Sequence, residues 1–164
     1  MKTIKLWTCL ACLCALVALA GCSQGAKEAG QVMTDYLNYI DQAQYDKAYD
    51  LLSDFDKGNI SEDDFAKWQQ QVAQIVDVES FSIDGKVDTF KNYKYLGTEF
   101  GTVYGLKVDR KQQMLIPGVE LAGYDQDSFR IMVQSQQGGG KVLLLITQLD
   151  DTIAAYDAYL ENLQ

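Results

Sequence analysis

The chain is 164 residues long, carries a formal net charge of −9 at pH 7, and contains no histidine. All four cysteines fall within residues 1–22, a stretch that contains no aspartate or glutamate. The rest of the chain therefore lacks the side chains of a Cys/His zinc site, a disulfide, a Cys–His pair or a Ser–His–Asp triad. The negative charge also argues against binding to nucleic acid, because its phosphates would repel the protein.

The first residues have the pattern of a secretory leader. Lys2 and Lys5 form a short basic segment, and Leu6–Ala20 is an apolar run of 15 residues rich in Leu, Ala and Cys. A helix needs about 20 apolar residues to cross a bilayer, so this run suits the hydrophobic region of a signal peptide better than a membrane span.

The leader ends in Leu19-Ala20-Gly21-Cys22. This ending resembles the lipobox of bacterial lipoprotein signals, in which cleavage precedes the cysteine and a diacylglycerol is attached to its sulfur. The resemblance implies a signal peptide at residues 1–21, a lipidated N-terminus at Cys22 and a short tether at residues 22–26. Two acyl chains, such as palmitate, form a stable anchor where one chain is marginal. The mature protein is then expected on the extracytoplasmic face of a bacterial membrane. Three further cysteines lie inside the hydrophobic run and are interpreted as small apolar residues, not metal ligands: Cys9, Cys12 and Cys14.

Residues 27–164 are predicted to form a single domain. Removal of residues 1–21 leaves 143 residues with a formal charge of −11, a size at which folding buries about 68–70% of the unfolded chain's surface. Apolar residues recur at helical spacing in residues 27–41, 45–52 and 61–76, which predicts three N-terminal helices. Ser61 and Asp64 resemble a capping box at the start of the third helix.

After residue 76 the apolar period changes from about 3.6 to 2, the period of strands. Strands are expected at residues 80–83, 87–95, 96–108, 114–121, 128–136 and 141–149, with Asp84-Gly85-Lys86 as a turn and residues 150–164 as a final helix. Three glycines on one face of the longest strand, at positions 97, 101 and 105, predict bending. The predicted fold class is α+β: N-terminal helices packed on a strongly curved, mainly antiparallel sheet, with a C-terminal helix.

The region 27–76 carries a second resemblance. After the lipobox and an amphipathic helix come Tyr45-Asp46-Lys47-Ala48-Tyr49-Asp50-Leu51-Leu52-Ser53 and then a helix opened by Ile60-Ser61 that carries Phe65 and Trp68. This order is similar to small bacterial lipoproteins of the nuclear-transport-factor-like superfamily. The resemblance implies a cystatin-like cone, with three helices on a bent sheet around a pocket. It does not decide function, because members include isomerases, dehydratases, trafficking factors and passive accessory domains.

Two motifs suggest ligands but miss the necessary geometry. The acidic segment Asp54–Phe65 has a composition that suits a calcium-binding loop of the EF-hand type. Whether the loop is started at Ser53 or at Asp54, an apolar residue, a lysine or a glycine falls at a position that needs an oxygen ligand. It is expected to be a turn between helices. Gly138-Gly139-Gly140-Lys141 lacks the following Ser/Thr of a phosphate loop and joins two strands, so it is predicted to be a hairpin. No metal or cofactor is expected.

The side chains left for chemistry are tyrosines and carboxylates. Ten tyrosines suit either core packing or a ligand pocket. Asp88 and Asp109 are carboxylates of the strand region that an isomerase-like site would need beside a tyrosine, but nothing in their spacing singles either out. Trp68 falls on the same helical stripe as Phe65 and Val72 and is predicted to pack against the sheet without contacting a ligand.

The sequence favours a non-catalytic binding module anchored in the cell envelope, and no catalytic, cofactor-binding or metal-binding residue is assigned. The expected partners are the membrane, through diacylglyceryl-Cys22, and a small apolar ligand or an envelope protein. Two alternatives stay open. One is a small isomerase- or dehydratase-type enzyme that uses Asp and Tyr in a cone-shaped pocket, and the other is a purely structural surface lipoprotein.

Overall fold

A computed structural model describes residues 24–116, 128–147 and 149–161. An N-terminal helix, described over residues 24–41, is followed by α2 (Tyr45–Asp50), α3 (Asp54–Asn59), α4 (Glu62–Ile75), β1 (Val76–Tyr95), β2 (Thr98–Met114), β3 (Ser128–Gln136), β4 (Gly139–Leu143) and α5 (Leu149–Glu161). The predicted α+β class is confirmed. Residues 24–26, expected to belong to the tether, are already helical.

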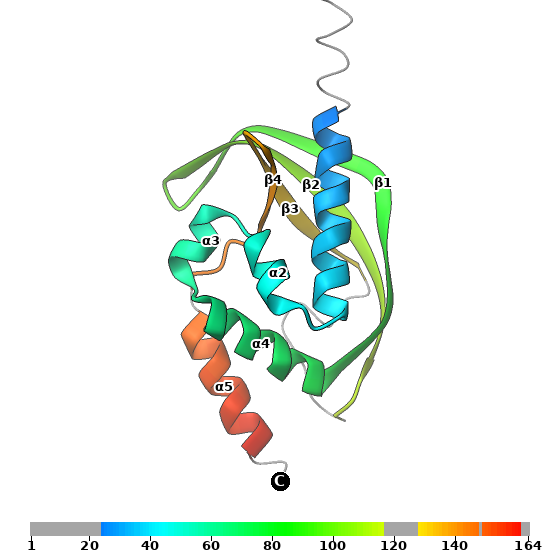
Figure 1. The fold of residues 1–164 in the computed structure, drawn as a ribbon, viewed down its shortest axis with the longest axis vertical. Helices are drawn as coiled ribbons and strands as arrows, with labels where there is room; N and C mark the ends of the chain where they lie inside the picture. Colours follow the sequence, from blue (N-terminus) through cyan, green and yellow to red (C-terminus); the bar gives the residue numbers. More distant parts are fainter. Residues whose placement is uncertain (1–23, 117–127, 148, 162–164) are drawn as a thin grey trace, which may run out of the picture.

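The sheet is a curled antiparallel meander with strand order β1-β2-β3-β4. The helices lie on one face of it, and β1 arcs around the outside (Figure 1). The outer edge of β4 is covered by the chain between α2 and α3. There the Ser53 N–H donates to the Val142 carbonyl, and the Val142 N–H donates to the Leu51 carbonyl, both at 2.8 Å. Both backbone polar groups of Val142 are therefore paired within the chain at this edge.

Serine caps start two of the helices. The Ser61 hydroxyl accepts a hydrogen bond from the Asp64 N–H at 3.1 Å, which confirms the predicted cap of α4. The Ser53 hydroxyl accepts from the Asp56 N–H at 3.2 Å and caps α3 in the same way. The prediction that residues 54–60 form a turn was wrong, because this cap and the contacts of Asp56 stabilise six residues as a helix.

The predicted turn at Asp84-Gly85-Lys86 is also corrected. Residues 76–95 form one strand of 20 residues, and the turn is a shift of register inside it. Ile83 pairs with Val108 and Val87 pairs with Leu106, so both sides of the irregularity face the same neighbour, β2. The extra residues form a bulge that bends β1 without reversing it. The described part of the chain accordingly has four strands where five or six were expected, and the expected strand at residues 114–121 lies mostly outside it.

Two of the strand glycines account for the curvature. Gly101 has a φ of +68° and lies where the β1–β2 register shifts, a conformation that favours glycine. At Gly105 a Cβ atom would lie 3.0 Å from Phe90 Cε2 and 3.1 Å from Arg130 Cδ, so a side chain there would press against both neighbours. Gly97, in contrast, belongs to the β1–β2 turn and not to a strand.

The main core lies between the helices and the concave side of the sheet. Its fully buried side chains come from every layer: Met33, Leu52, Phe65, Leu106, Val108, Val133 and Val142. No helix in the described ranges combines the length and apolar character that crossing a membrane requires.

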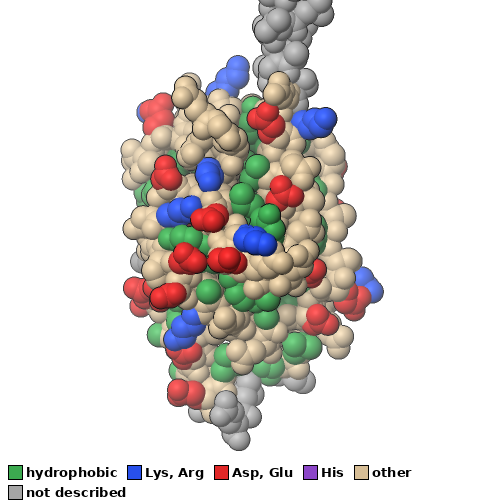
Figure 2. Space-filling model, in the orientation of Figure 1, with side chains coloured by type: hydrophobic (Ala, Val, Ile, Leu, Met, Phe, Trp, Pro, Cys, Tyr) green, Lys and Arg blue, Asp and Glu red, His purple; other side chains and the backbone are tan. Residues whose placement is uncertain are grey.

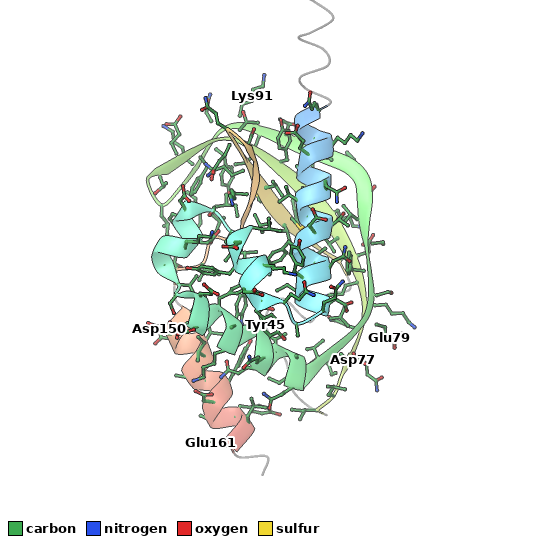
Figure 3. The ribbon with its side chains drawn as sticks, in the orientation of Figure 1. Tyr45, Asp77, Glu79, Lys91, Asp150 and Glu161 are labelled. Atoms are coloured by element: carbon green, nitrogen blue, oxygen red, sulfur yellow. The ribbon has the colours of Figure 1, made fainter. Side chains whose placement is uncertain are left out.

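The C-terminal helix α5 packs along α4, with Asp150 near its start and Glu161 at its end (Figure 3). Gln71 Nε2 donates to the Ile153 carbonyl at 3.1 Å and to Asp157 Oδ1 at 2.7 Å. Lys67 Nζ donates to Asp157 Oδ2 at 2.6 Å. The predicted apolar stripe of α5 is confirmed where it is described, because Ile153 is buried and Tyr156 and Leu160 pack against α4 and β1.

Candidate functional site

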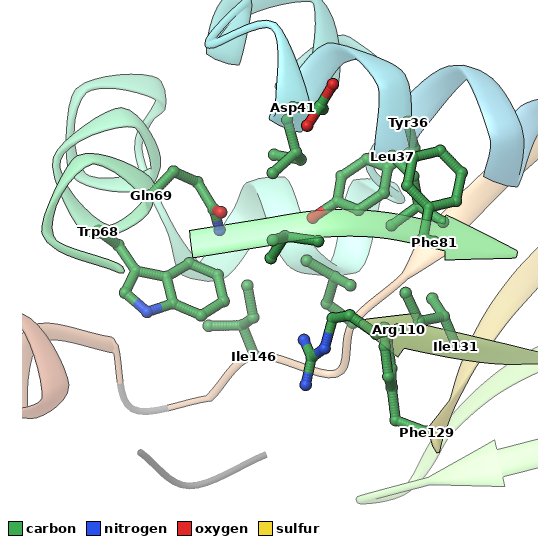
Figure 4. Close-up of a pocket in the computed structure, with 13 residues that line it drawn as sticks. Tyr36, Leu37, Asp41, Trp68, Gln69, Phe81, Arg110, Phe129, Ile131 and Ile146 are labelled. Carbon is green, nitrogen blue, oxygen red and sulfur yellow. The ribbon is translucent and has the colours of Figure 1, made fainter. Parts of the chain in front are cut away.

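A cavity of about 370 Å³ opens between the helices and the concave face of the sheet (Figure 4). Its walls are formed by residues of the N-terminal helix, of α4, of each of the strands β1, β2 and β3, and of the segment after β4. The lining residues are Tyr36, Leu37, Ile40, Asp41, Trp68, Gln69, Val78, Phe81, Arg110, Phe129, Ile131, Leu144 and Ile146. Its volume falls in the range of about 300–1,000 Å³ typical of small-molecule sites.

Most of the cavity wall is hydrocarbon. Leu37 and Ile40 face it from the N-terminal helix, and Phe81, Phe129 and Ile131 face it from the sheet. Such a wall favours a molecule with an apolar body, because each Å² of apolar surface removed from water contributes about 25 cal/mol.

Three polar side chains face the otherwise apolar cavity: Tyr36, Gln69 and Arg110. Arg110 projects from β2 toward Ile146, and its guanidinium carbon lies 4.3 Å from the centre of the Phe129 ring (Figure 4). Gln69, on α4, is 5% exposed, and its amide faces the cavity. The Tyr36 hydroxyl points into the same space from the N-terminal helix, whereas the carboxylate of exposed Asp41 points away from it (Figure 4).

The wall after β4 is held by one buried carboxylate. Asp56 is 0% exposed, and its two oxygens accept hydrogen bonds from the backbone N–H groups of Leu144 and Ile146, each at 2.9 Å. The Ser53 hydroxyl donates a third hydrogen bond to it at 2.7 Å. Because Leu144 and Ile146 line the cavity, Asp56 shapes the cavity from behind without facing it.

The two carboxylates considered for an enzyme lie outside the cavity. Asp88 forms an ion pair with Arg130 at 2.8 Å. Hydrogen bonds from Lys107 and then Ser128 lower the pKa of Asp109, and Lys107 Nζ lies 2.9 Å from its Oδ1. Both side chains form ion pairs at the surface, and neither lines the cavity. Cys22, the predicted lipidation site, lies outside the described residues.

The prediction that Trp68 packs on the same stripe as Phe65 is confirmed, and the structure adds that Trp68 also lines the cavity. Phe65 and Val72 are buried as expected, but Trp68 is only half-buried and lines the cavity. Its ring meets that of Phe65 edge-on, with centroids 6.1 Å apart. The edge of this helical stripe therefore lies between the filled core and the cavity. The tyrosines, which could serve either core packing or a ligand pocket, do both. Tyr36 lines the cavity, whereas Tyr93 and Tyr95 pack in a separate aromatic cluster.

Arg110 was missed by the sequence analysis, although a signal was present. Tyr104, Leu106 and Val108 alternate along β2 and are all buried. Arg110 is the next position of that period, so a cation follows directly in the row that faces the core. A charge at the end of a buried apolar row is what marks this residue.

Neither a family model nor a curated protein matches the chain. Within the described residues no group of three or more Cys, His, Asp or Glu side chains is placed to hold a metal ion.

Proposed function

We propose that this protein is a lipid-anchored binding module of the bacterial cell envelope that holds a small apolar molecule in the cavity between its helices and its sheet. The single observation that carries the binding function is the roughly 370 Å³ apolar cavity. Packed protein interiors leave few voids larger than a water molecule, so a cavity of this size in an otherwise buried core is a feature that ligand binding explains.

The lining chemistry favours binding over catalysis. An isomerase-type site would place a desolvated carboxylate against a tyrosine or another hydrogen-bond donor. Asp41 is the acidic residue of the lining, and it is exposed to solvent. The other acidic candidates, Asp88 and Asp109, form surface ion pairs.

The envelope location rests on the leader and its lipobox. With Cys22 two residues before the described N-terminal helix, the domain would lie close to the membrane surface. Acidic side chains are spread over the face in Figure 2, which suits a domain that is held by its anchor and is not attracted to anionic headgroups.

The anchor is tested by Cys22→Ser in the protein's own host. The substituted precursor should stay uncleaved by the lipoprotein peptidase and should take up no labelled fatty acid. Unchanged acyl incorporation would contradict the anchor.

The cavity is tested with 1-aminonaphthalene, a small neutral aromatic dye whose fluorescence increases in apolar surroundings. Ile40→Trp adds an indole to the cavity wall and should abolish the increase in dye fluorescence. Leu96→Trp, at a position 72% exposed on the β1–β2 turn, is the matched control and should bind the dye like the wild type. Equal dye binding by the two variants would refute the cavity as the binding site.

A further inference from the structure

Aromatic side chains border the cavity on two facing sides. Four rings belong to the lining, each from a different element: Tyr36 of the N-terminal helix, Trp68 of α4, Phe81 of β1 and Phe129 of β3. The indole of Trp68 approaches the cavity from one side, and the other three rings lie across the cavity from it (Figure 4). A ligand in this cavity would therefore lie between ring systems.

The rings on opposite sides are not packed on each other. Aromatic side chains that pack together have centroids about 4.5–7 Å apart. Trp68 has such a contact with the buried Phe65, at 6.1 Å. Among the described residues, neither Phe81 nor Phe129 has a contact with another aromatic ring. The space between Trp68 and Phe81 is thus open to a further ring, supplied by a ligand.

The two charged residues of the lining do not call for a charged ligand. The carboxylate of exposed Asp41 points away from the cavity (Figure 4). The Arg110 guanidinium stacks on Phe129, with its carbon 4.3 Å from the ring centre, and has a further interaction within the chain. Transfer of an ionic group from water into apolar surroundings is strongly unfavourable unless a partner is ready to receive it. The lining therefore favours a neutral ligand.

The volume limits the ligand to about two fused rings. The cavity holds about 370 Å³, roughly twelve times the 30 Å³ that one water occupies in the liquid, which corresponds to about a dozen non-hydrogen atoms. An apolar protein cavity of about 150 Å³ takes up one benzene molecule. Both comparisons indicate a bicyclic molecule with at most a small substituent.

We propose that the cavity binds a neutral planar aromatic molecule of about two fused rings, which lies between Trp68 and Phe81. Ring pairs in offset-stacked or edge-to-face geometry are more stable than burial of the same area alone explains, so an aromatic ligand gains contacts that a saturated one lacks. This inference rests on the proposed binding function and adds the chemical class of the ligand.

The test compares an aromatic probe, 2-naphthol, with decahydro-2-naphthol, which has the same carbon skeleton and hydroxyl group but no aromatic ring. A third probe, 2-naphthoate, puts an anionic carboxylate on the aromatic skeleton. Binding is measured at neutral pH by equilibrium dialysis. One chamber holds the full chain in phosphatidylcholine vesicles and the other holds the same vesicles without protein, so that partitioning of each probe into the membrane cancels.

Two variants replace a ring of the cavity with an aliphatic side chain: Trp68→Leu and Phe81→Leu. Each should weaken binding of 2-naphthol about three-fold or more relative to decahydro-2-naphthol, because one aromatic pair is lost. The ratio of the two dissociation constants is the measure, since a change in cavity volume or in stability affects both probes alike. In the wild type, 2-naphthoate should bind about ten-fold or more weakly than 2-naphthol, because its charge would be buried without a partner.

Phe55→Leu is the matched control. Phe55 packs on Phe100 with ring centroids 5.3 Å apart, in an aromatic cluster separate from the cavity lining. Its substitution also removes a partly buried ring. The ratio of the two dissociation constants should stay at the wild-type value.

Four outcomes would overturn the inference. Equal weakening of 2-naphthol and decahydro-2-naphthol in both cavity variants would mean that the rings serve only as apolar surface, while the cavity and the proposed function stand. The same change of ratio in Phe55→Leu would mean that the effect does not arise in the cavity. Binding of 2-naphthoate as tight as that of 2-naphthol would refute a neutral ligand. Binding of none of the three probes would overturn both this inference and the proposed function.

Discussion

Replacement of Asp56 should show how strongly one buried carboxylate holds the cavity wall. Its Oδ2 accepts hydrogen bonds from the Ser53 hydroxyl at 2.7 Å and the Leu144 N–H at 2.9 Å, and its Oδ1 accepts from the Ile146 N–H at 2.9 Å. The side chain is 0% exposed. Asp56→Ala leaves two backbone donors and one hydroxyl without an acceptor in the space behind the cavity.

The expected cost follows from those orphaned donors. Each buried donor left without a partner costs about 1–3 kcal/mol, so the two backbone groups alone predict a loss of about 2–6 kcal/mol in the free energy of unfolding. This is a large part of the roughly 5–15 kcal/mol that stabilises a domain. Asp56→Asn keeps one oxygen but turns an NH₂ group toward the remaining donor, and should cost about 2–3 kcal/mol.

The measurement is urea unfolding followed by far-ultraviolet circular dichroism, with Asp54→Asn as the control. Asp54 is exposed in the first turn of the same helix, so its substitution should cost no more than about 1 kcal/mol through the helix dipole. Amide hydrogen exchange at Leu144 and Ile146 should also become faster in Asp56→Ala and stay unchanged in the control.

A small effect would refute the reasoning. If Asp56→Ala unfolds within about 1 kcal/mol of the wild type, the three hydrogen bonds do not hold the segment after β4. If stability falls but exchange at Leu144 and Ile146 does not change, the loss arises in α3 and not in the cavity wall.

Three further substitutions test other parts of the fold. Leu96 has a φ of +47° in the β1–β2 turn and is 72% exposed; Leu96→Asn should raise the free energy of unfolding by about 0.5–1 kcal/mol, because Asn tolerates this conformation better, and no gain in urea unfolding would contradict the strain. The hydrogen bond from Lys67 lowers the pKa of Asp157, so its stabilisation is present above the unfolded pKa of about 3.9 and is lost as the pH falls through the lower folded pKa. The difference in melting temperature between wild type and Asp157→Asn should therefore shrink as the pH falls from 6 toward 2, and a difference independent of pH would refute this role. Trp68→Ala should lower the free energy of unfolding in urea by about 1–3 kcal/mol, because Trp68 is half-buried and a fully buried aromatic costs about 3–5 kcal/mol. A loss of about 4 kcal/mol or more would mean that Trp68 is packed like a fully buried core residue.

Sequence patterns predicted those helices and bends that depend on residues close together in the chain. The N-terminal helix, α4 and α5 follow from the spacing of their apolar residues. The start of α4 was predicted from Ser61 and Asp64, which lie three positions apart as in a capping box. The glycine positions predicted curvature because glycine lacks the side chain that would crowd the inside of a bent strand, as the close neighbours of Gly105 show. The α+β class follows from the order of these elements along the chain.

The wrong predictions share one physical reason. Asp84-Gly85 is compatible with both a reversal and a bulge, and the choice depends on whether the two flanks pair with each other or with a third strand. The segment at residues 54–59 has a weak helical pattern, and beyond its Ser53 cap it is held by the buried Asp56, which accepts hydrogen bonds from backbone N–H groups 88 and 90 residues away. Interactions over such distances leave no mark in a local window.

The sequence alone therefore determined the class of fold and most of its helices, since each depends on residues that are close together in the chain; the leader with its lipobox cysteine stays a prediction of the same local kind. The tertiary structure decided which of these residues form a site. Trp68, Gln69, Arg110 and Ile146 come from two helix positions, a strand and a loop, and they become neighbours only when α4 and the segment after β4 close over the sheet. Periodicity reports which side of an element is apolar, but whether that side meets packed side chains or an open cavity depends on the volume its distant neighbours fill.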